Sequence, residues 1–140
     1  MRVVSTVINR PVEACWRVFT DPQQLTGWVP GLRYAQVIEL DDDERPREVR
    51  FEFATTLAYV LVYSYDFQAG LVHWEPREAN HGGVSGYASF VAIEGGTQFT
   101  YALEHDDGRK AAERMLDDPR TLCEAFTRWM HESRASEPLA

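Results

Sequence analysis

The chain has 140 residues, of which 44% are hydrophobic and 12% aromatic, and its formal net charge is −8. This composition argues against nucleic-acid binding, which needs clustered Lys and Arg. It also argues against a polybasic membrane patch, because Lys110 is the only lysine in the sequence. No run of about 18 apolar residues could span a bilayer, and no signal-peptide pattern precedes the first strand. We expect a cytoplasmic protein with one domain over residues 1–140.

The first predicted elements are a strand and two short helices. Val3 to Ile8 is typical of a strand, and Pro11 then stands where a first helical residue belongs. A second helix is expected to start at Asp21-Pro22, with Asp21 as its cap, and to end near Gly27. The apolar face of the first helix follows helical spacing and comprises Val12, Cys15, Trp16 and Phe19. Free thiols on such faces are usually buried, so we expect Cys15 and Cys123 to be unpaired.

The middle of the chain changes to the two-residue period of strands. Phe51 and Phe53 alternate with Arg50 and Glu52, so both phenylalanines should face inward. The segment 57–67 is apolar on both faces and is predicted to be a central strand covered on each side. Gly95-Gly96 is a hairpin signal. The predicted strands are Arg33–Leu40, Glu48–Thr55, Leu57–Phe67, Leu71–Glu75, Val84–Ile93 and Thr97–His105.

The last predicted element is an amphipathic helical region after Gly108. Met115 and Leu116 precede an interruption at Asp118-Pro119, and the apolar spacing then resumes. The resumed stripe comprises Leu122, Phe126, Trp129 and Met130. Residues 134–140 are expected to be a frayed tail.

This order of elements and two sequence signatures resemble a known superfamily. Residues 8–22, followed by Leu25, Trp28, Pro30 and Gly31, resemble the N-terminal signature of the SRPBCC, polyketide cyclase/dehydrase-like branch of the START-like, Bet v 1-like superfamily. Residues 86–90 and 95–97 resemble its late hairpin. The resemblance implies an α+β helix-grip fold. In it, a curved seven-stranded antiparallel sheet carries two short helices after its first strand and a long C-terminal helix over its concave face.

Two departures from the family pattern concern the cavity that such a fold encloses. Ala88 stands where relatives commonly place a large aromatic side chain, and Asp118-Pro119 interrupts a helix that is usually continuous. We expect Ala88 to enlarge the cavity and the interruption to alter how the helix closes it.

The resemblance implies a ligand pocket between the concave sheet face and the last helix, lined by inward aromatic residues. The sequence leaves open which faces of 57–67 and 71–75 line it. The candidate ligand-binding residues are Phe51, Phe53, Tyr63, Tyr65, Trp74, Ala88, Phe90, Tyr101, Phe126 and Trp129.

Catalysis would need polar groups among these apolar ones. Tyr63, His73 and Glu75 are the candidates by residue type for proton transfer, although alternation places His73 and Trp74 on opposite faces. His105-Asp106-Asp107 is interpreted as a turn because adjacent ligands rarely converge on a metal. No second His or Cys lies at helical or hairpin spacing, so we expect no metal. Because there is no phosphate-binding glycine loop and no nucleophile elbow, nucleotide-dependent and covalent catalysis are disfavoured, and we expect no cofactor.

Three functions remain open from the sequence. The first is binding of a small hydrophobic or aromatic ligand such as a lipid, a quinone or a polyketide-like compound. The second is a cyclase or aromatase that uses pocket Tyr, His or Glu. The third is an interaction module for a chaperone or ribosome, in which the acidic surface and an exposed Trp28-Val29-Pro30 would make the contact. A homodimer is left open as well.

Overall fold

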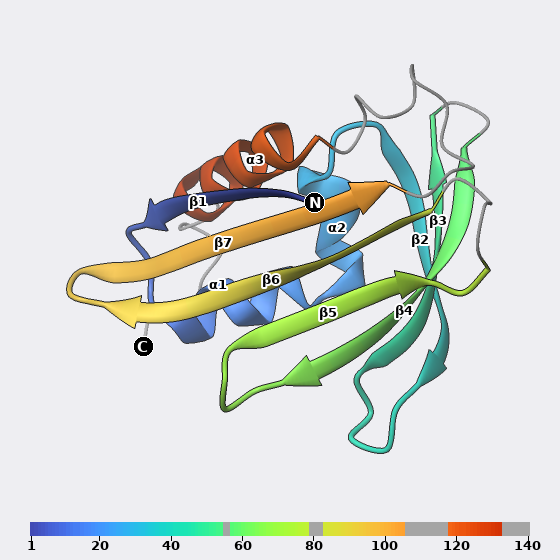
Figure 1. Cartoon of the computed structure of the whole chain (residues 1–140), viewed down its shortest axis with the longest axis horizontal. Coiled ribbons are helices and arrows are strands. Elements are labelled where there is room, and N and C mark those ends of the chain that lie inside the picture. The colour runs from blue at the N-terminus through green and yellow to red at the C-terminus, as the bar shows by residue number, and fades with distance from the viewer. Residues whose placement is uncertain (55–56, 79–82, 106–117, 133–140) are drawn as a thin grey trace.

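The computed structural model describes residues 1–54, 57–78, 83–105 and 118–132, and its helices and strands follow the expected order (Figure 1). The strands in this part of the chain are β1 (Arg2–Ile8), β2 (Leu32–Leu40), β3 (Pro46–Phe53), β4 (Ala58–Asp66), β5 (Leu71–Pro76), β6 (Val84–Ile93) and β7 (Gly96–His105). The helices are α1 (Val12–Phe19), α2 (Pro22–Trp28) and α3 (Pro119–Glu132). The expected α+β order is therefore confirmed.

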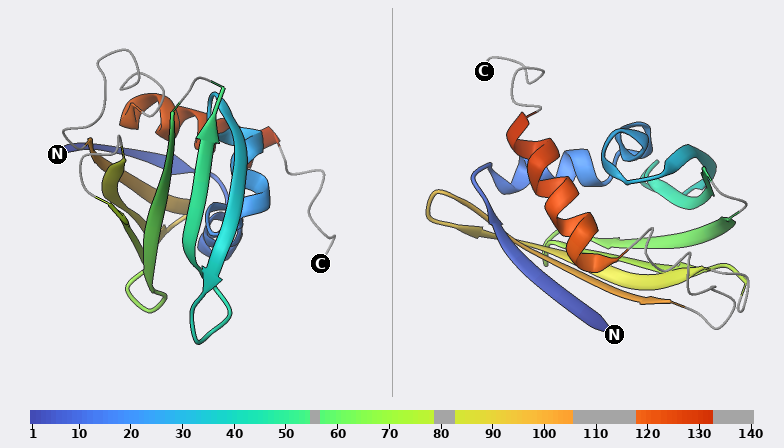
Figure 2. Two further views of the ribbon diagram at one scale, coloured as in Figure 1. Left: turned by 90° about the vertical axis from the view of Figure 1, so that its right-hand side faces the viewer. Right: turned by 90° about the horizontal axis from the view of Figure 1, so that it is seen from above.

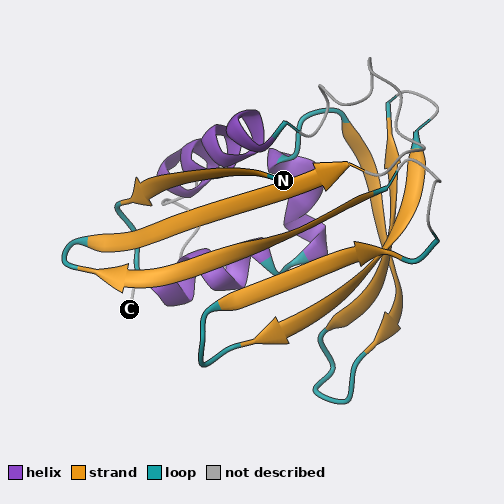
Figure 3. Cartoon of the chain, in the orientation of Figure 1, coloured by secondary structure: helices purple, strands orange, loops and turns teal. Residues whose placement is uncertain are grey.

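The strands form a single antiparallel sheet in the order β1-β7-β6-β5-β4-β3-β2 (Figure 3). From β2 to β7 each strand pairs with the next along the chain, and β1 pairs with β7 to form the edge opposite β2. Gly95, at a φ of 85°, makes the tight turn between β6 and β7 that its sequence predicts. Figure 2 shows the sheet curving and all three helices on one face of it. This is the helix-grip arrangement.

Acidic side chains begin two of the helices. The Asp21 carboxylate accepts a hydrogen bond from the Gln23 amide at 3.0 Å, and Pro22 is the first residue of α2. The Asp118 carboxylate accepts one from the Arg120 amide at 2.9 Å in the same way. Asp118-Pro119 is therefore the start of α3, and the predicted helical residues Met115 and Leu116 lie outside the described residues.

The core is a cluster of aromatic rings with Phe19 at its centre. Phe19 is the last residue of α1, and its side chain is 6% exposed. Ring centroids of six other residues lie 5.4–6.0 Å from that of Phe19. They are Trp28 of α2, Trp74 of β5, Phe90 of β6, Phe99 and Tyr101 of β7, and Phe126 of α3. One side chain thus joins three strands and all three helices.

Two expectations about burial are wrong. The sequence predicts that segment 57–67 is covered on both sides, but only the face of β4 that carries Tyr59 and Leu61 is buried, and Phe67 is 64% exposed. The reason is that the helices lie on one face of the sheet only. Trp28, expected on the surface as part of a protein-binding segment, is 5% exposed because it packs against Phe19 and Phe126.

Buried hydrogen bonds join the two ends of the described chain. The Thr97 hydroxyl donates to the Arg10 carbonyl at 2.8 Å, and the Arg10 guanidinium donates to the Met130 carbonyl of α3. The Cys15 thiol donates a hydrogen bond to the Thr97 hydroxyl at 3.8 Å. Cys15 and Cys123 are both free and buried, as expected. Thr97 thereby fixes the connection between β1 and α1 against β7.

Replacing Thr97 by Val should lower the free energy of unfolding by about 1–3 kcal/mol. The substitution keeps the shape of the side chain but removes a fully buried hydroxyl that bonds the Arg10 carbonyl. Urea denaturation measures the change. The matched control is Thr100→Val, whose hydroxyl pairs with Ser5 at 2.8 Å in an exposed position and should cost less than about 0.5 kcal/mol. Equal losses in the two variants would contradict the assigned role of Thr97.

Candidate ligand-binding site

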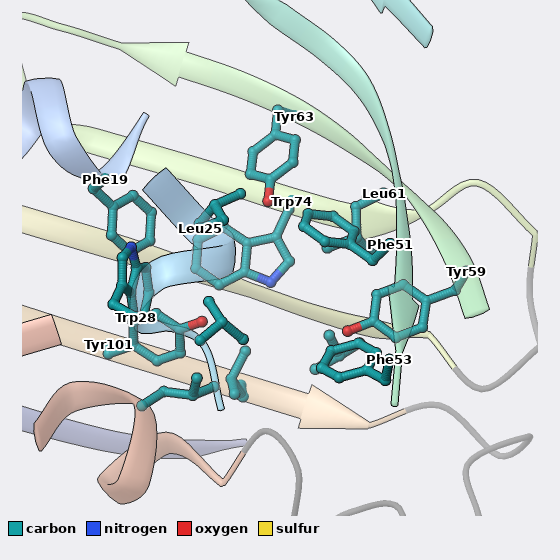
Figure 4. Close-up of a pocket in the computed structure, with 14 residues that line it drawn as sticks. Phe19, Leu25, Trp28, Phe51, Phe53, Tyr59, Leu61, Tyr63, Trp74 and Tyr101 are labelled. Carbon is teal, nitrogen blue, oxygen red and sulfur yellow. The ribbon is translucent and has the colours of Figure 1, made fainter. Parts of the chain in front are cut away.

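An apolar pocket lies between the concave face of the sheet and the helices (Figure 4). Its walls come from α1, α2 and the residue after α2, from strands β3 to β7, and from α3. The lining residues are Phe19, Leu25, Trp28, Val29, Phe51, Phe53, Tyr59, Leu61, Tyr63, Trp74, Val84, Tyr101, Leu103 and Leu122. Every one of them is hydrophobic or aromatic and none carries a charge.

The pocket is narrow because its aromatic walls lie close together. The cavity between them has a volume of only about 40 Å³, counted as the space open to the centre of a water molecule. One water needs roughly 10–15 Å³ by that measure, so the pocket holds a few waters at most. A larger ligand therefore has to displace side chains or helices.

Hydroxyl and indole groups are the polar atoms in these walls. Figure 4 shows the Tyr63 hydroxyl pointing toward other lining residues. Burial, together with the neighbouring Tyr65, raises the pKa of Tyr63 above its ordinary value, so its phenol stays protonated. The Trp28 indole nitrogen is buried and has no hydrogen-bond partner in the described part of the chain. Neutral donors of this kind suit a ligand that offers oxygen acceptors and no charge.

Five of the ten residues proposed from the sequence line this pocket, and five do not. Those that line it are Phe51, Phe53, Tyr63, Trp74 and Tyr101. Phe90 and Phe126 lie in the core cluster around Phe19, outside the lining. Ala88 is fully buried between its strand partners Val72 and Tyr101 and adds no space to the pocket.

The remaining two candidates have structural contacts of their own. Tyr65 borders a smaller recess beside the pocket, and its hydroxyl donates to the Pro46 carbonyl. Trp129 donates its indole N–H to the Gln24 side chain at 3.3 Å. Its ring lies so close to Gly27 that a Cβ at that position would be 2.6 Å from it, so any larger residue there would force the Trp129 ring to shift. Trp129 therefore fastens the two helices together.

The three catalytic candidates do not meet. His73 and Glu75 flank Trp74 on β5, and both are exposed on the face of the sheet that the helices leave free. The His73 ring lies 5.9 Å from that of Tyr87, away from the pocket. Tyr63 is thus the one candidate of the three in the lining, and no carboxylate or imidazole accompanies it there.

Sequence reasoning missed the contribution of the helices to the lining. Phe19, Leu25 and Trp28 line the pocket from the N-terminal pair of helices, together with Val29 just beyond them. A signal existed for Tyr59, because it shares a strand face with Leu61 and Tyr63 at the two-residue period. For α1 and α2 the apolar spacing marks a buried face without saying which part borders a cavity.

In the residues that the structure describes, no three His, Cys, Asp or Glu side chains gather as a metal site. Asp106 and Asp107 of the segment interpreted as a turn lie outside those residues. No helix in the described ranges has both the length and the apolar character to cross a membrane.

Alkaline pH should destabilise the protein through its buried tyrosines. Burial raises the pKa of Tyr63 and of Tyr65, so their stabilising effect is complete below about pH 10 and is lost as the pH rises above it. Urea unfolding at a series of alkaline pH values measures the loss. The double variant Tyr63→Phe, Tyr65→Phe should show a shallower decline. An unchanged decline in that variant would contradict this assignment.

Many solved structures share the fold, and three of them illustrate the likeness. The Zhui aromatase/cyclase from Streptomyces sp. R1128 aligns with a TM-score of 0.76 at 15% identity, covering 99% of each chain. A START superfamily protein from Mycobacterium smegmatis gives 0.73 at 12% identity, covering 94% of this chain and 97% of that one. A STAR-related lipid transfer protein from Xanthomonas axonopodis gives 0.72 at 12% identity, covering 92% and 84%. At these identities the likeness shows the fold alone.

The sequence itself supplies the family. Residues 2–133, nearly the whole chain, match the model of a family described as polyketide cyclase/dehydrase and lipid transport. No curated protein sequence matches. The chain therefore belongs to the polyketide cyclase/dehydrase and lipid transport family.

Proposed function

We propose that the protein binds a small, uncharged hydrophobic or aromatic molecule, such as a lipid, a quinone or a polyketide-like compound, in the pocket beneath its helices. The observation that carries the proposal is the pocket wall itself, in which fourteen hydrophobic or aromatic residues surround a space without a charged group. Apolar walls with a few oriented polar atoms are typical of small-molecule sites. The family description, and the name of the lipid transfer protein from Xanthomonas axonopodis, point in the same direction.

Binding by this pocket requires it to open. Sites for small molecules usually enclose about 300–1,000 Å³, far more than the water-accessible space here. Phe53, Val84 and Leu103 stand at or near the strand ends on one side of the pocket, and α2 closes the other side through Leu25 and Trp28. A ligand that separates these groups replaces the contacts among the aromatic side chains by contacts between those side chains and the ligand. The shape and the apolar surface area of the ligand therefore determine which molecule binds.

The lining favours binding over catalysis. Proton transfer near neutral pH needs a group whose pKa lies near the operating pH, and burial moves the pKa of Tyr63 the other way. No described lining residue is a carboxylate or an imidazole. Tyr63 is suited instead to donate a hydrogen bond to a carbonyl or hydroxyl oxygen. The cyclase alternative would need a second polar group from outside this lining.

Native mass spectrometry of the freshly purified protein is the direct test of the proposal. A retained small molecule, identified after extraction, would support it. If nothing is retained, titration with a graded set of fatty acids, quinones and aromatic polyketides, followed by intrinsic tryptophan fluorescence, provides the second test, because Trp28 and Trp74 line the pocket. Absence of binding across that set would overturn the proposal.

Two substitutions should change affinity in opposite directions. Val84→Phe adds a ring to the pocket and should weaken binding about tenfold, whereas Phe53→Leu removes one and should admit larger ligands. Isothermal titration with the ligand found above measures both. Val91→Phe is the matched control, since Val91 lies on the same strand as Val84 but is 48% exposed. Equal losses in all three variants would place the binding site elsewhere.

A further inference from the structure

The strand β2 ends the sheet with a free edge. Among the described strands it pairs only with β3, whereas β1 at the opposite edge lies beside α3 (Figure 1). Proteins usually protect such an edge with Lys, Pro or a covering element, because unpaired backbone groups there accept another strand. The segment 34–38 of β2 has no charged residue and no proline.

Large apolar side chains accumulate on this strand in spite of its exposure. The most exposed of them are Tyr34 at 46%, Val37 at 37%, Ile38 at 47% and Leu40 at 51%. Strand β3, by contrast, buries its apolar residues Val49, Phe51 and Phe53 and exposes its charged ones in part. The end of the sheet at β2 thus presents an apolar strand that the rest of the described chain does not cover.

The sequence of β2 is complementary to itself. If two copies of the strand lie antiparallel about a twofold axis at Gln36, each residue faces a suitable partner. The facing pairs are Leu32 with Leu40, Arg33 with Glu39, Tyr34 with Ile38, Ala35 with Val37, and Gln36 with Gln36. Apolar residues face apolar ones, and the two opposite charges of the strand face each other on both sides of the axis.

The charges of β2 are incompletely matched within one chain. Arg33 makes no ion pair with another described residue. Glu39 faces the like charge of Glu48 on β3, and the hydrogen bond shared with Glu48 raises the pKa of Glu39, while Arg47 lies 3.9 Å away. A second copy would bring its Arg33 to this carboxylate pair.

We propose that the protein forms a homodimer by antiparallel pairing of two β2 strands about a twofold axis at Gln36. The two sheets then continue into one, and because the axis is perpendicular to the sheet, both pockets open on the same side of the dimer. The paired surface is one strand wide, so the dimer is expected to dissociate on dilution.

The first test is sedimentation equilibrium of the intact protein over a range of concentrations. Wild type should show a monomer–dimer equilibrium. Gln36→Glu should raise the dimer dissociation constant about tenfold, since two carboxylates then meet at the axis. In the monomer the same glutamate faces Arg50 on β3, so the fold should be no less stable. A wild-type protein that stays monomeric at its highest soluble concentration would overturn the proposal.

Charge exchange tests the register. Arg33→Glu and Glu39→Arg should each weaken the homodimer, because like charges then face each other in both copies. Mixing the two variants should restore a dimer, since every facing pair is again opposite in charge. Native mass spectrometry distinguishes the mixed dimer by mass. Absence of a preference for the mixed dimer would contradict this register.

Crosslinking tests the position of the axis. Gln36→Cys should form an intermolecular disulfide under mild oxidation, because facing Cβ atoms of antiparallel strands lie about 4.5–5.5 Å apart. Cys15 and Cys123 are buried and should not interfere. Val3→Cys, on the β1 edge and also exposed, is the matched control and should crosslink far more slowly. Equal rates for the two variants would show that the contact is not at β2.

Discussion

The packing of Phe19 between the sheet and the last helix is the contact on which the rest of the structure depends. Its ring packs against aromatic residues of three strands and of α2 and α3, so it sets the distance between the helices and the concave face of the sheet. It is also one of the residues that line the pocket. The same side chain thus stabilises the fold and limits the space in which a ligand can lie, so removing it would change both at once.

The narrowness of the pocket follows from this packing. An empty apolar cavity costs stability roughly in proportion to its volume, and the closed walls avoid that cost in the absence of a ligand. The walls consist of rings and branched aliphatic chains from several elements. The buried Trp28 indole nitrogen, without a partner in the described chain, is the polar group that gains most if an oxygen-bearing ligand enters.

The sequence predicted the order of elements well because each depends on local rules. Proline and aspartate begin helices at Asp21-Pro22 and Asp118-Pro119, and the period of two places Phe51 and Phe53 inward. The wrong predictions concern which face of the sheet the helices cover. Segment 57–67 looks apolar on both sides, yet the helices cover one, and a protein surface retains much apolar area. Alternation already separated His73 from Trp74, but only the fold shows that Trp74 faces the pocket. The lining by α1 and α2 depends on how these helices lie over the sheet, which periodicity does not encode.

The one-sided arrangement that creates the pocket also leaves the β2 edge uncovered. Helices α1 and α3 lie beside β1, β6 and β7, and α2 reaches only the beginning of β2. Beyond that point β2 has neither a helix over its concave face nor a neighbour along its outer edge, so Val37, Ile38 and Leu40 are exposed together. A longer α2 would cover only the side chains on the concave face of β2 and would also close the pocket further. A second copy of the strand can bind the unpaired backbone groups of the β2 edge without entering the cavity. Pairing at β2 therefore leaves the pocket beneath the helices free to bind a ligand.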